Sequence, residues 1–434
     1  MSVIPKELDY TKPVSLPSSA RSTSLVSVPQ GGIGPYQAGT QITFPLVQYG
    51  FLCPDSMYLS ATLKFTNGAT GTANYILGVP STAWINRIDC FINSSNVETI
   101  NAVGPLTQML LSAKMNSMDK SGLSYPLGLN FNGDGAFTSE ESDSFIIPSS
   151  TATGAVVSLQ IATPIPCIFA NCEKYYPLGA GECRIQLTTD QLSNFTCLST
   201  GAATTLTSYE ITNVQLNYDI LEMDADVQSA VLSQVDEEGN MYLKSESYAV
   251  SSANIATAFS GYLEIPYSNS LTSIKSLYFL ACRSDRYKNF SAYDPTQSNG
   301  SIQFTIAGQP FPPTAIDTLN RRPSAVLEFL EAIHGTKVSP LTARTCLSFI
   351  NFRNSTVAQG SDSVTNMSKA YFGVSTEKIS GSYLLTGISS QNSNITVRLN
   401  IGTVTDVALN GLLIANHDVL LKINPATRQV VVLK

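Results

Sequence analysis

The chain has 434 residues, a formal net charge of −7 and only 13% charged residues. This length favours two domains of roughly 200 residues each over a single core. The acidic balance argues against a polyanion partner, because nucleic-acid binding needs clustered Lys and Arg. We therefore expect no direct nucleic acid binding by the folded body. Ser, Thr and Asn fill the polar positions, which suits surfaces that lose water in dense lateral contacts.

Residues 1–40 are rich in Ser, Pro and Gly and predict an extended N-terminal arm. The start, MSVIPKELDYTKP, has no charged segment followed by an apolar one, so we expect synthesis in the cytoplasm without a signal peptide. No apolar run approaches the length of a membrane span. The glycines of PQGGIGPYQAG lack the context of a phosphate-binding loop and indicate a hinge.

From residue 41 the dominant pattern is an alternation of apolar and polar residues, which places alternate side chains on opposite faces of a sheet. It is clearest in five segments: 59–65, 157–161, 213–220, 302–306 and 395–401. Many short strands with one buried face, separated by Gly, Pro, Asn and Ser turns, predict β-sandwiches or barrels.

Helical patterns are few. The segments 105–115 and 323–335 each open with a proline near the first turn, and the second closes on His334 and Gly335, as helix ends often do. A third helical segment, 223–239, is acidic and lies between the two β-rich halves. It is the predicted connection between two domains.

The two halves repeat a local pattern. RIDCFINSSNVETI (87–100) and SIQFTIAGQPFPPTAI (301–316) both predict a strand, a tight turn and a second strand, and a helix follows each of them. The helix-opening residues Pro105 and Pro323 are 218 positions apart, and the strand residues Ile88 and Phe304 are 216 apart. Two copies of one sandwich topology explain this best, although strand-turn-strand-helix is common enough to recur by chance.

Taken in order, these segments resemble the double-jelly-roll major capsid proteins of icosahedral DNA viruses. The resemblance rests on the strand-hairpin-helix of each half, on KYYPLGAGECRIQL (174–187), on YEITNVQLNYDILEMD (209–224) and on the closing DVALNGLLIANHDVLLKI. It implies an all-β chain of two consecutive eight-stranded jelly rolls (β-sandwiches) with a few short helices. The implied domains are the arm 1–40, a first jelly roll 41–222, a helical connector 223–240 and a second jelly roll 241–434.

The resemblance also implies a function. Such a chain is a structural virion protein that self-assembles as pseudo-hexagonal homotrimers, and these build an icosahedral capsid with penton and minor capsid proteins as further partners. Segments 117–148 and 355–392, where the alternation lapses, are the candidate loops of the outer surface. An internal membrane is possible but unsupported by the sequence, and the nearly neutral arm leaves contact with a virion membrane or genome open.

No enzyme is expected, and no catalytic, cofactor-binding or metal site. The two histidines, His334 at a helix end and His417 in a predicted loop before a strand, stand near no recognisable nucleophile motif. The acidic run 139–143 lies within one loop and does not set the separation that glycoside chemistry requires. Trp84, Tyr175 and Tyr176 are expected to be core or interface anchors, with carbohydrate stacking as the alternative.

One loop has the spacing of an EF-hand calcium site. The matching positions are Asn130, Asn132, Asp134, Gly135 and Glu141, with Asn in place of the usual first Asp. A solvated surface loop is the expected structure, because Gly/Asn-rich loop tips produce such spacings by chance.

Two further residue classes have simple expected roles. The eight cysteines contain no C-x-x-C pair and lie mostly in apolar strands, so we expect buried free thiols: Cys53, Cys90, Cys167, Cys172, Cys183, Cys197, Cys282 and Cys346. Seven glycosylation sequons are expected to be unused: Asn93, Asn194, Asn289, Asn299, Asn354, Asn366 and Asn394.

Two other classes of function remain in competition. A β-sandwich carbohydrate-binding or adhesion protein would explain the Ser/Thr/Asn-rich loops, but it should carry a signal peptide or an aromatic platform. A cupin-like enzyme would need a histidine cluster for its metal, and two distant histidines do not provide one.

Overall fold

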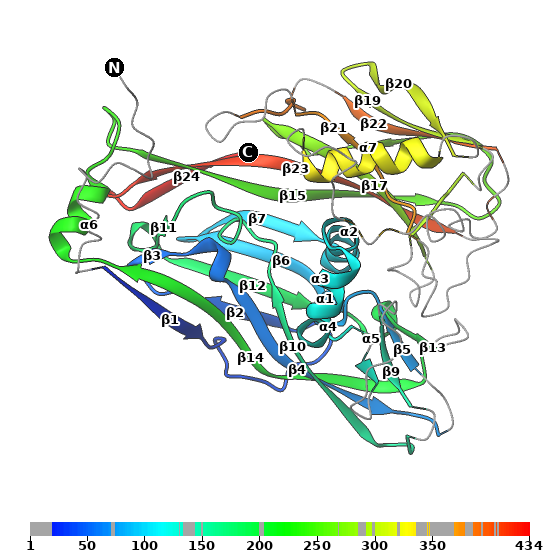
Figure 1. Cartoon of the computed structure of the whole chain (residues 1–434), viewed down its shortest axis with the longest axis horizontal. Helices are drawn as coiled ribbons and strands as arrows, with labels where there is room; N and C mark the ends of the chain where they lie inside the picture. Colours follow the sequence, from blue (N-terminus) through cyan, green and yellow to red (C-terminus); the bar gives the residue numbers. More distant parts are fainter. Residues whose placement is uncertain are drawn as a thin grey trace.

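The computed structural model contains two β-sandwiches that lie side by side, with few helices (Figure 1). We call them the first sandwich (β1 to β14) and the second sandwich (β15 to β24). The connection between them carries helix α6 (Ala225–Leu232). The structure describes residues 20–70, 74–129, 131–132, 144–148, 151–198, 204–267, 269–284, 292–296, 300–318, 322–335, 345, 347, 369–377, 385–391, 394–402, 405 and 408–434.

The first sandwich packs a six-stranded sheet against a four-stranded one, and a further four-stranded sheet lies at one end. The six-stranded sheet contains β10 (Val156–Pro164), β4 (Tyr58–Asn67), β14 (Leu206–Glu222), β3 (Phe51–Leu52) and β11 (Tyr176–Pro177), with β1 (Arg21–Ser27) beside β14. The opposite sheet contains β2 (Gln41–Pro45), β12 (Cys183–Thr189), β6 (Ile85–Ile92) and β7 (Ser95–Asn101). The four-stranded sheet at the end contains β13 (Thr196–Leu198), β5 (Asn74–Leu77), β9 (Ser144–Ile147) and β8 (Phe131–Asn132).

The second sandwich is also a six-stranded sheet against a four-stranded one. The larger sheet contains β15 (Met241–Ile255), β23 (Leu409–Asn424), β17 (Ile274–Arg283) and β18 (Ala292–Tyr293), with β21 (Phe372–Ser375) beside β17 and β24 (Gln429–Leu433) beside β23. The smaller sheet contains β16 (Gly261–Pro266), β22 (Ile395–Ile401), β19 (Ser301–Ile306) and β20 (Gln309–Asp317).

The pairing order of the first sandwich recurs in the second. In the larger sheets β1, β14, β4 and β10 pair in the same order as β15, β23, β17 and β21. In the four-stranded sheets that face them, β2, β12, β6 and β7 pair in the same order as β16, β22, β19 and β20. The repeat predicted from 87–100 and 301–316 therefore corresponds to hairpins β6–β7 and β19–β20, and each hairpin leads to a helix. Eight strands per sandwich follow one topology, and the predicted all-β fold class is confirmed.

The alternating pattern decides which face of each strand is buried. Along β4, Leu59, Leu63 and Phe65 are fully buried, while the intervening side chains are partly exposed. β22 has the same arrangement in the second sandwich. Each strand therefore contributes one apolar face to its core, because one-residue steps turn side chains to opposite sides of a sheet.

The two predicted proline-opened helices are present as α2 (Val103–Lys114) and α7 (Arg322–His334). The connector helix α6 is shorter than the predicted 223–239. The Asp236 side chain accepts hydrogen bonds from the backbone N–H groups of Glu238 and Asn240 at 2.9 and 2.8 Å, and so forms a turn instead of a further helical turn. Other helices are α1 (Pro80–Ala83), α3 (Ser117–Gly122), α4 (Ser124–Leu127) and α5 (Leu192–Phe195), with 3₁₀ turns at Pro54–Ser56 and Leu178–Ala180.

Three segments expected to lack regular structure contain some. Residues 21–27 of the predicted arm form β1, which pairs with β14, and the Ser24 hydroxyl donates to Asp219 at 2.6 Å. The predicted loop 117–148 contains α3, α4, β8 and β9, and α3 begins with a capping box between Asn116 and Asp119. The predicted loop 355–392 contains β21, a strand too short to show a clear alternation.

We expect Phe304→Ala to lower the free energy of unfolding by about 3–5 kcal/mol, because Phe304 is fully buried in the second sandwich and its truncation leaves a cavity. Urea unfolding followed by fluorescence measures this. Val431→Ala is the matched control, since Val431 is 51% exposed on β24 and its truncation should change stability by less than about 0.5 kcal/mol. Equal effects of the two substitutions would contradict the assigned core.

Candidate assembly interface

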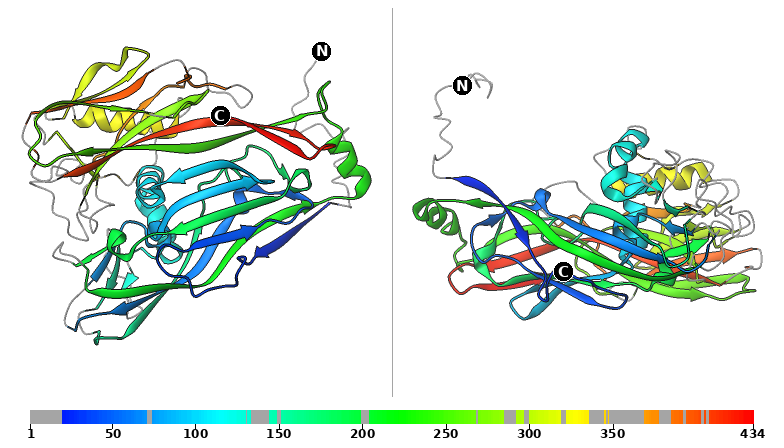
Figure 2. Two further views of the ribbon diagram at one scale, coloured as in Figure 1. Left: turned by 180° about the vertical axis from the view of Figure 1, so that it is seen from behind. Right: turned by 90° about the horizontal axis from the view of Figure 1, so that it is seen from below.

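The two sandwiches meet through an apolar contact that continues the core of the first. Residues of the second sandwich belong to the same buried cluster as the first sandwich's own core: Leu243, Tyr248, Tyr278, Leu412 and Ile414. β7 contacts β15, and α2 contacts α7. Figure 1 and the rear view in Figure 2 both show β15 and β23 running directly along the first sandwich. The contact is therefore part of the folded chain and not a loose hinge between domains.

Buried hydrogen bonds fix the position of β15 on the first sandwich. Glu98 of β7 is 2% exposed, and it accepts from the backbone N–H of Ile168 at 2.8 Å and from the Ser247 hydroxyl of β15. The Ser245 hydroxyl donates to the carbonyl of Ile168 at 2.6 Å. Burial raises the pKa of Glu98, and the hydrogen bonds from Ser247 and Ile168 oppose this effect. A carboxyl group at this depth needs these donors, so they specify the register of the contact.

A second polar group lies on β23. Asp418 is fully buried and accepts from the Ser273 hydroxyl at 2.8 Å and from the backbone N–H of Thr386 at 3.1 Å. The Lys244 ammonium lies 3.3 Å from the other oxygen of Asp418 and 3.5 Å from Glu173 of the first sandwich. Charge pairing thus links the two sandwiches through one lysine.

His417 lies next to Asp418 and is 2% exposed. The prediction that His417 lies in a loop before a strand was wrong, because it stands inside β23, where both faces are covered. It lines a cavity of about 400 Å³ together with Glu98, Ser247 and Lys434. Burial lowers the pKa of His417 to about 4. His417 is therefore neutral at pH 7 and belongs to the contact between the sandwiches.

The other histidine, His334, ends α7 and lines a separate polar cavity of about 190 Å³. Lys114 of α2, the ion pair Lys275–Glu246 and Asn416 also line it. The Asn416 side-chain oxygen is buried there without a hydrogen-bond partner. The structure does not bring the two histidines into one cavity.

The remaining candidates mostly serve the core. Trp84 is fully buried, and its indole N–H donates to the Ser81 carbonyl at 2.9 Å, while Tyr176 is buried and Tyr175 is 50% exposed. Five of the described cysteines are buried free thiols and Cys53 is half-buried. Within the described ranges, no group of three or more His, Cys, Asp or Glu side chains could hold a metal ion.

The EF-hand-like loop 130–141 and the acidic run 139–143 lie outside the described residues, apart from the two residues of β8. None of the helices in the described part of the chain is long and apolar enough to span a bilayer.

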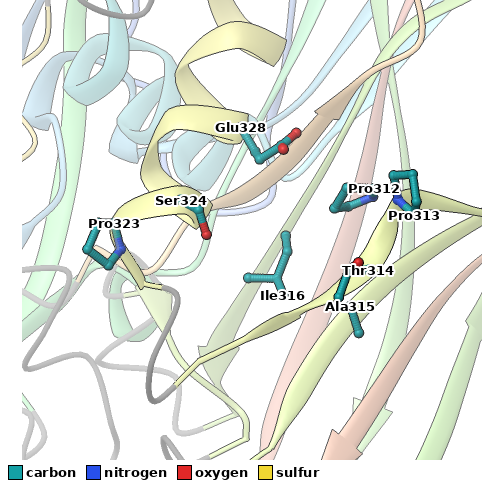
Figure 3. A pocket seen from close by; sticks show the side chains of 8 residues that line it. All are labelled: Pro312, Pro313, Thr314, Ala315, Ile316, Pro323, Ser324 and Glu328. Carbon is teal, nitrogen blue, oxygen red and sulfur yellow. The ribbon is translucent and has the colours of Figure 1, made fainter.

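A further cavity lies at the edge of the second sandwich, between β20 and the start of α7 (Figure 3). Its volume is about 620 Å³, and its lining is mostly apolar: Pro312, Pro313, Thr314, Ala315, Ile316, Pro323, Ser324 and Glu328. We call it the β20–α7 pocket. β20 is the last strand of its sheet, and its prolines lack the N–H groups that another strand would need for pairing. A partner can therefore contact this edge through side chains but not extend the sheet at the prolines.

Solved structures share this arrangement over the whole chain. The PBCV-1 virus capsid matches with a TM-score of 0.58 and 12% identity, covering 98% of this chain and 99% of the other. The Faustovirus major capsid protein matches with a TM-score of 0.58 and 10% identity, covering 98% and 93%. The mavirus major capsid protein matches with a TM-score of 0.53 and 10% identity, covering 100% and 95%.

The chain has the double-jelly-roll fold. The predicted resemblance is thereby confirmed at the level of the fold, because identities of this size carry no more than the architecture. No family model and no curated protein matches the sequence. Each sandwich described above is one of the two jelly rolls, and the contact through β15 is the contact between the rolls.

Sequence reasoning missed the polar residues that join the jelly rolls. Glu98, Ser247 and Lys434 carry no local motif. A signal did exist for the neighbouring strand, since NYDI at 217–220 of β14 matches NHDV at 416–419 of β23. Aligning these tetrapeptides places His417 on the last long strand of its roll, as Tyr218 is on β14.

Between pH 6.5 and pH 4 the free energy of unfolding should fall in the wild type and in the His417→Gln variant by different amounts. We expect the fall to be larger in the wild type, by up to about 3 kcal/mol. The folded pKa of His417 lies below the ordinary 6.5, so the unfolded chain binds the proton first as the pH falls, and stability is lost over this window. Denaturant unfolding across this range measures it. The same series on His334→Gln, which removes the chain's other histidine, is the control, and parallel curves for wild type and His417→Gln would refute the assignment.

Proposed function

We propose that this chain is a structural virion protein, a major capsid protein that self-assembles as pseudo-hexagonal homotrimers to form an icosahedral shell. The observation that carries the proposal is the fixed side-by-side placement of two jelly rolls of one topology. Three such chains present six similar blocks around one axis, and closed rings bury sheet edges that would otherwise pair without control.

The similar structures support a capsid role, since they are a virus capsid and two major capsid proteins. On this proposal the protein resides in the virion, its partners are further copies, neighbouring trimers, penton proteins and minor capsid proteins, and it catalyses no reaction. The net charge of −7 supports a folded body that does not bind nucleic acid directly.

We further propose the domain division that the sequence predicts: arm 1–40, first jelly roll 41–222, helical connector 223–240 and second jelly roll 241–434. β1 is then the part of the arm that joins the large sheet of the first jelly roll. α6 supports the connector assignment, because none of its residues is buried against either roll.

We expect the purified protein to form a stable species of three times 46.5 kDa, because each chain supplies two of the six jelly rolls of the proposed trimer. Light scattering coupled to size-exclusion chromatography measures the mass, and negative-stain electron microscopy should show a pseudo-hexagonal outline. A strict monomer across the micromolar range would contradict the assembly, and binding of that monomer to a glycan array would favour the carbohydrate-binding alternative.

A further inference from the structure

A lysine and an aspartate meet in the larger sheet of the second jelly roll. Lys244 lies on β15 and Asp418 on β23, 174 positions apart in the sequence, and β15 pairs with β23 along its whole length. The Asp418 side chain is fully buried, and that of Lys244 is 9% exposed. The Lys244 nitrogen and the carboxylate oxygen Oδ1 of Asp418 lie 3.3 Å apart. An amine and a carboxyl group are therefore held in contact where water has little access.

This contact is an ion pair without the alignment of a hydrogen bond. Asp418 Oδ1 is buried and has no hydrogen-bond partner among the described residues, although the Lys244 nitrogen lies so near. Glu246, which stands opposite Asp418 on β15, forms a direct hydrogen bond with Lys275. Two buried charges that are poorly aligned regain little of the free energy that they lose with their water. A neutral amide between Lys244 and Asp418 would remove both charges from the interior.

The other carboxylate oxygen of Asp418 is held by two donors. Oδ2 accepts from the Ser273 hydroxyl at 2.8 Å and from the Thr386 backbone N–H at 3.1 Å. Ser273 in turn accepts from the backbone N–H of Gly387 at 2.9 Å, which fixes its hydroxyl. Donors fixed in this way stabilise the negative charge that develops on a carboxyl oxygen when a nucleophile adds to its carbon. The carboxyl group is thus oriented, with Oδ2 stabilised and Oδ1 beside the amine.

A second carboxylate lies where a proton must move. Glu173 Oε1 is 3.5 Å from the Lys244 nitrogen. The Glu173 backbone N–H donates to the Lys244 carbonyl at 3.0 Å, and this bond keeps the two residues side by side across the contact between the rolls. A carboxylate in this position can take a proton from the ammonium and return it to a leaving oxygen.

We propose that Lys244 and Asp418 condense into an amide bond within the chain, with Glu173 as the proton carrier. The Lys244 ammonium gives one proton to Glu173, and the amine adds to the carboxyl carbon of Asp418. The bond from that carbon to Oδ1 then breaks. Oδ1 leaves as water with the proton from Glu173 and a second proton from the nitrogen. The ammonium and carboxylate charges cancel, and no further reactant is needed.

The bond joins the first and the last long strand of the second jelly roll and closes a loop of 174 residues. A link between positions so far apart in sequence restricts the unfolded chain and stabilises the fold. The condensation occurs once in each chain, so it modifies the protein and turns over no substrate. It goes beyond the proposed assembly, because it acts within one chain whether or not copies associate.

The mass of the intact full-length chain tests the proposal. The purified wild-type protein should weigh about 18 Da less than its sequence, because one water is lost. A cyclised aspartate would lose the same mass, so a tryptic digest must also show one branched peptide that joins Lys244 to Asp418. Folded wild-type protein that keeps the full mass, or that loses water without the branched peptide, overturns the proposal.

Three variants separate the reaction from the packing of the charges. Asp418→Asn cannot form the ion pair, but it should form the same amide with release of ammonia, a loss of about 17 Da. Freshly purified Glu173→Gln should keep the full mass of its sequence, because the proton carrier is removed. It should also melt at least about 5 °C below the wild type, because the cross-link is absent. Lys422→Met is the control, since it removes an exposed ion pair with Glu238 on the same strand and should leave the loss of water unchanged.

The outcomes are distinct from those of the assembly test. A linked wild type, a linked Asp418→Asn chain and an unlinked Glu173→Gln chain support the proposal. A wild type without the bond, or a folded Asp418→Asn chain without it, overturns the proposal whether the protein is trimeric or monomeric. A linked Glu173→Gln chain overturns the assignment of Glu173 as the proton carrier.

Discussion

The burial of both faces of the sheet built on β15, β23 and β17 is the constraint on which the rest of the molecule depends. From Gly411 to Val419 every residue of β23 is buried. Its inner face closes the second jelly roll, where a side chain at Gly411 would meet Ile265 and Phe279 at 3.1 Å. Its outer face meets the first jelly roll, where Leu412 and Ile414 join the neighbouring core. Because one strand serves both cores, the two rolls have a fixed relative position.

The equivalent sheet of the first jelly roll is covered on its outer face to a much smaller extent. β14 keeps a regular alternation, with Leu216, Tyr218 and Ile220 buried and the residues between them partly exposed. The chain thus has one covered and one open version of the same sheet face. In the proposed ring of copies, unlike surfaces of neighbouring chains would meet head to tail, and closure would leave neither surface uncovered.

The sequence predicts those parts of the fold in which one face is buried. The strands β4 and β22 follow their alternation, and α2 and α7 follow their opening prolines. β23 loses the alternation because both of its faces are covered, and this is why His417 was placed in a loop. β1 could not be foreseen, because its partner is far away in sequence: Ser24 and Asp219 are 195 positions apart.

The polar contacts between the jelly rolls escape prediction for the same reason. Glu98 and Ser247 are ordinary residues of a hairpin and a strand, and only the packing of one roll on the other brings them together, 149 positions apart. Local sequence specifies which face of a strand is apolar. It does not specify which distant surface will cover the other face.

The two equivalent sheets also differ in the polar chemistry of their outer faces. The covered sheet contains charges that are buried or half-buried, with Lys244 beside the buried Asp418 at 3.3 Å and Lys275 paired with Glu246. Such pairs need complete partners and accurate geometry, which a contact formed once during folding can supply. On the outer face of β1 and β14 most groups are neutral or already hydrogen-bonded: the Asn217 amide donates to the Ser60 hydroxyl at 3.0 Å, and the Asp219 carboxylate accepts from the Ser24 hydroxyl at 2.6 Å. Neutral groups that already hold a hydrogen bond cost less to desolvate when a surface meets a second molecule. The low charged fraction of 13% therefore fits the proposed contacts between copies of the chain.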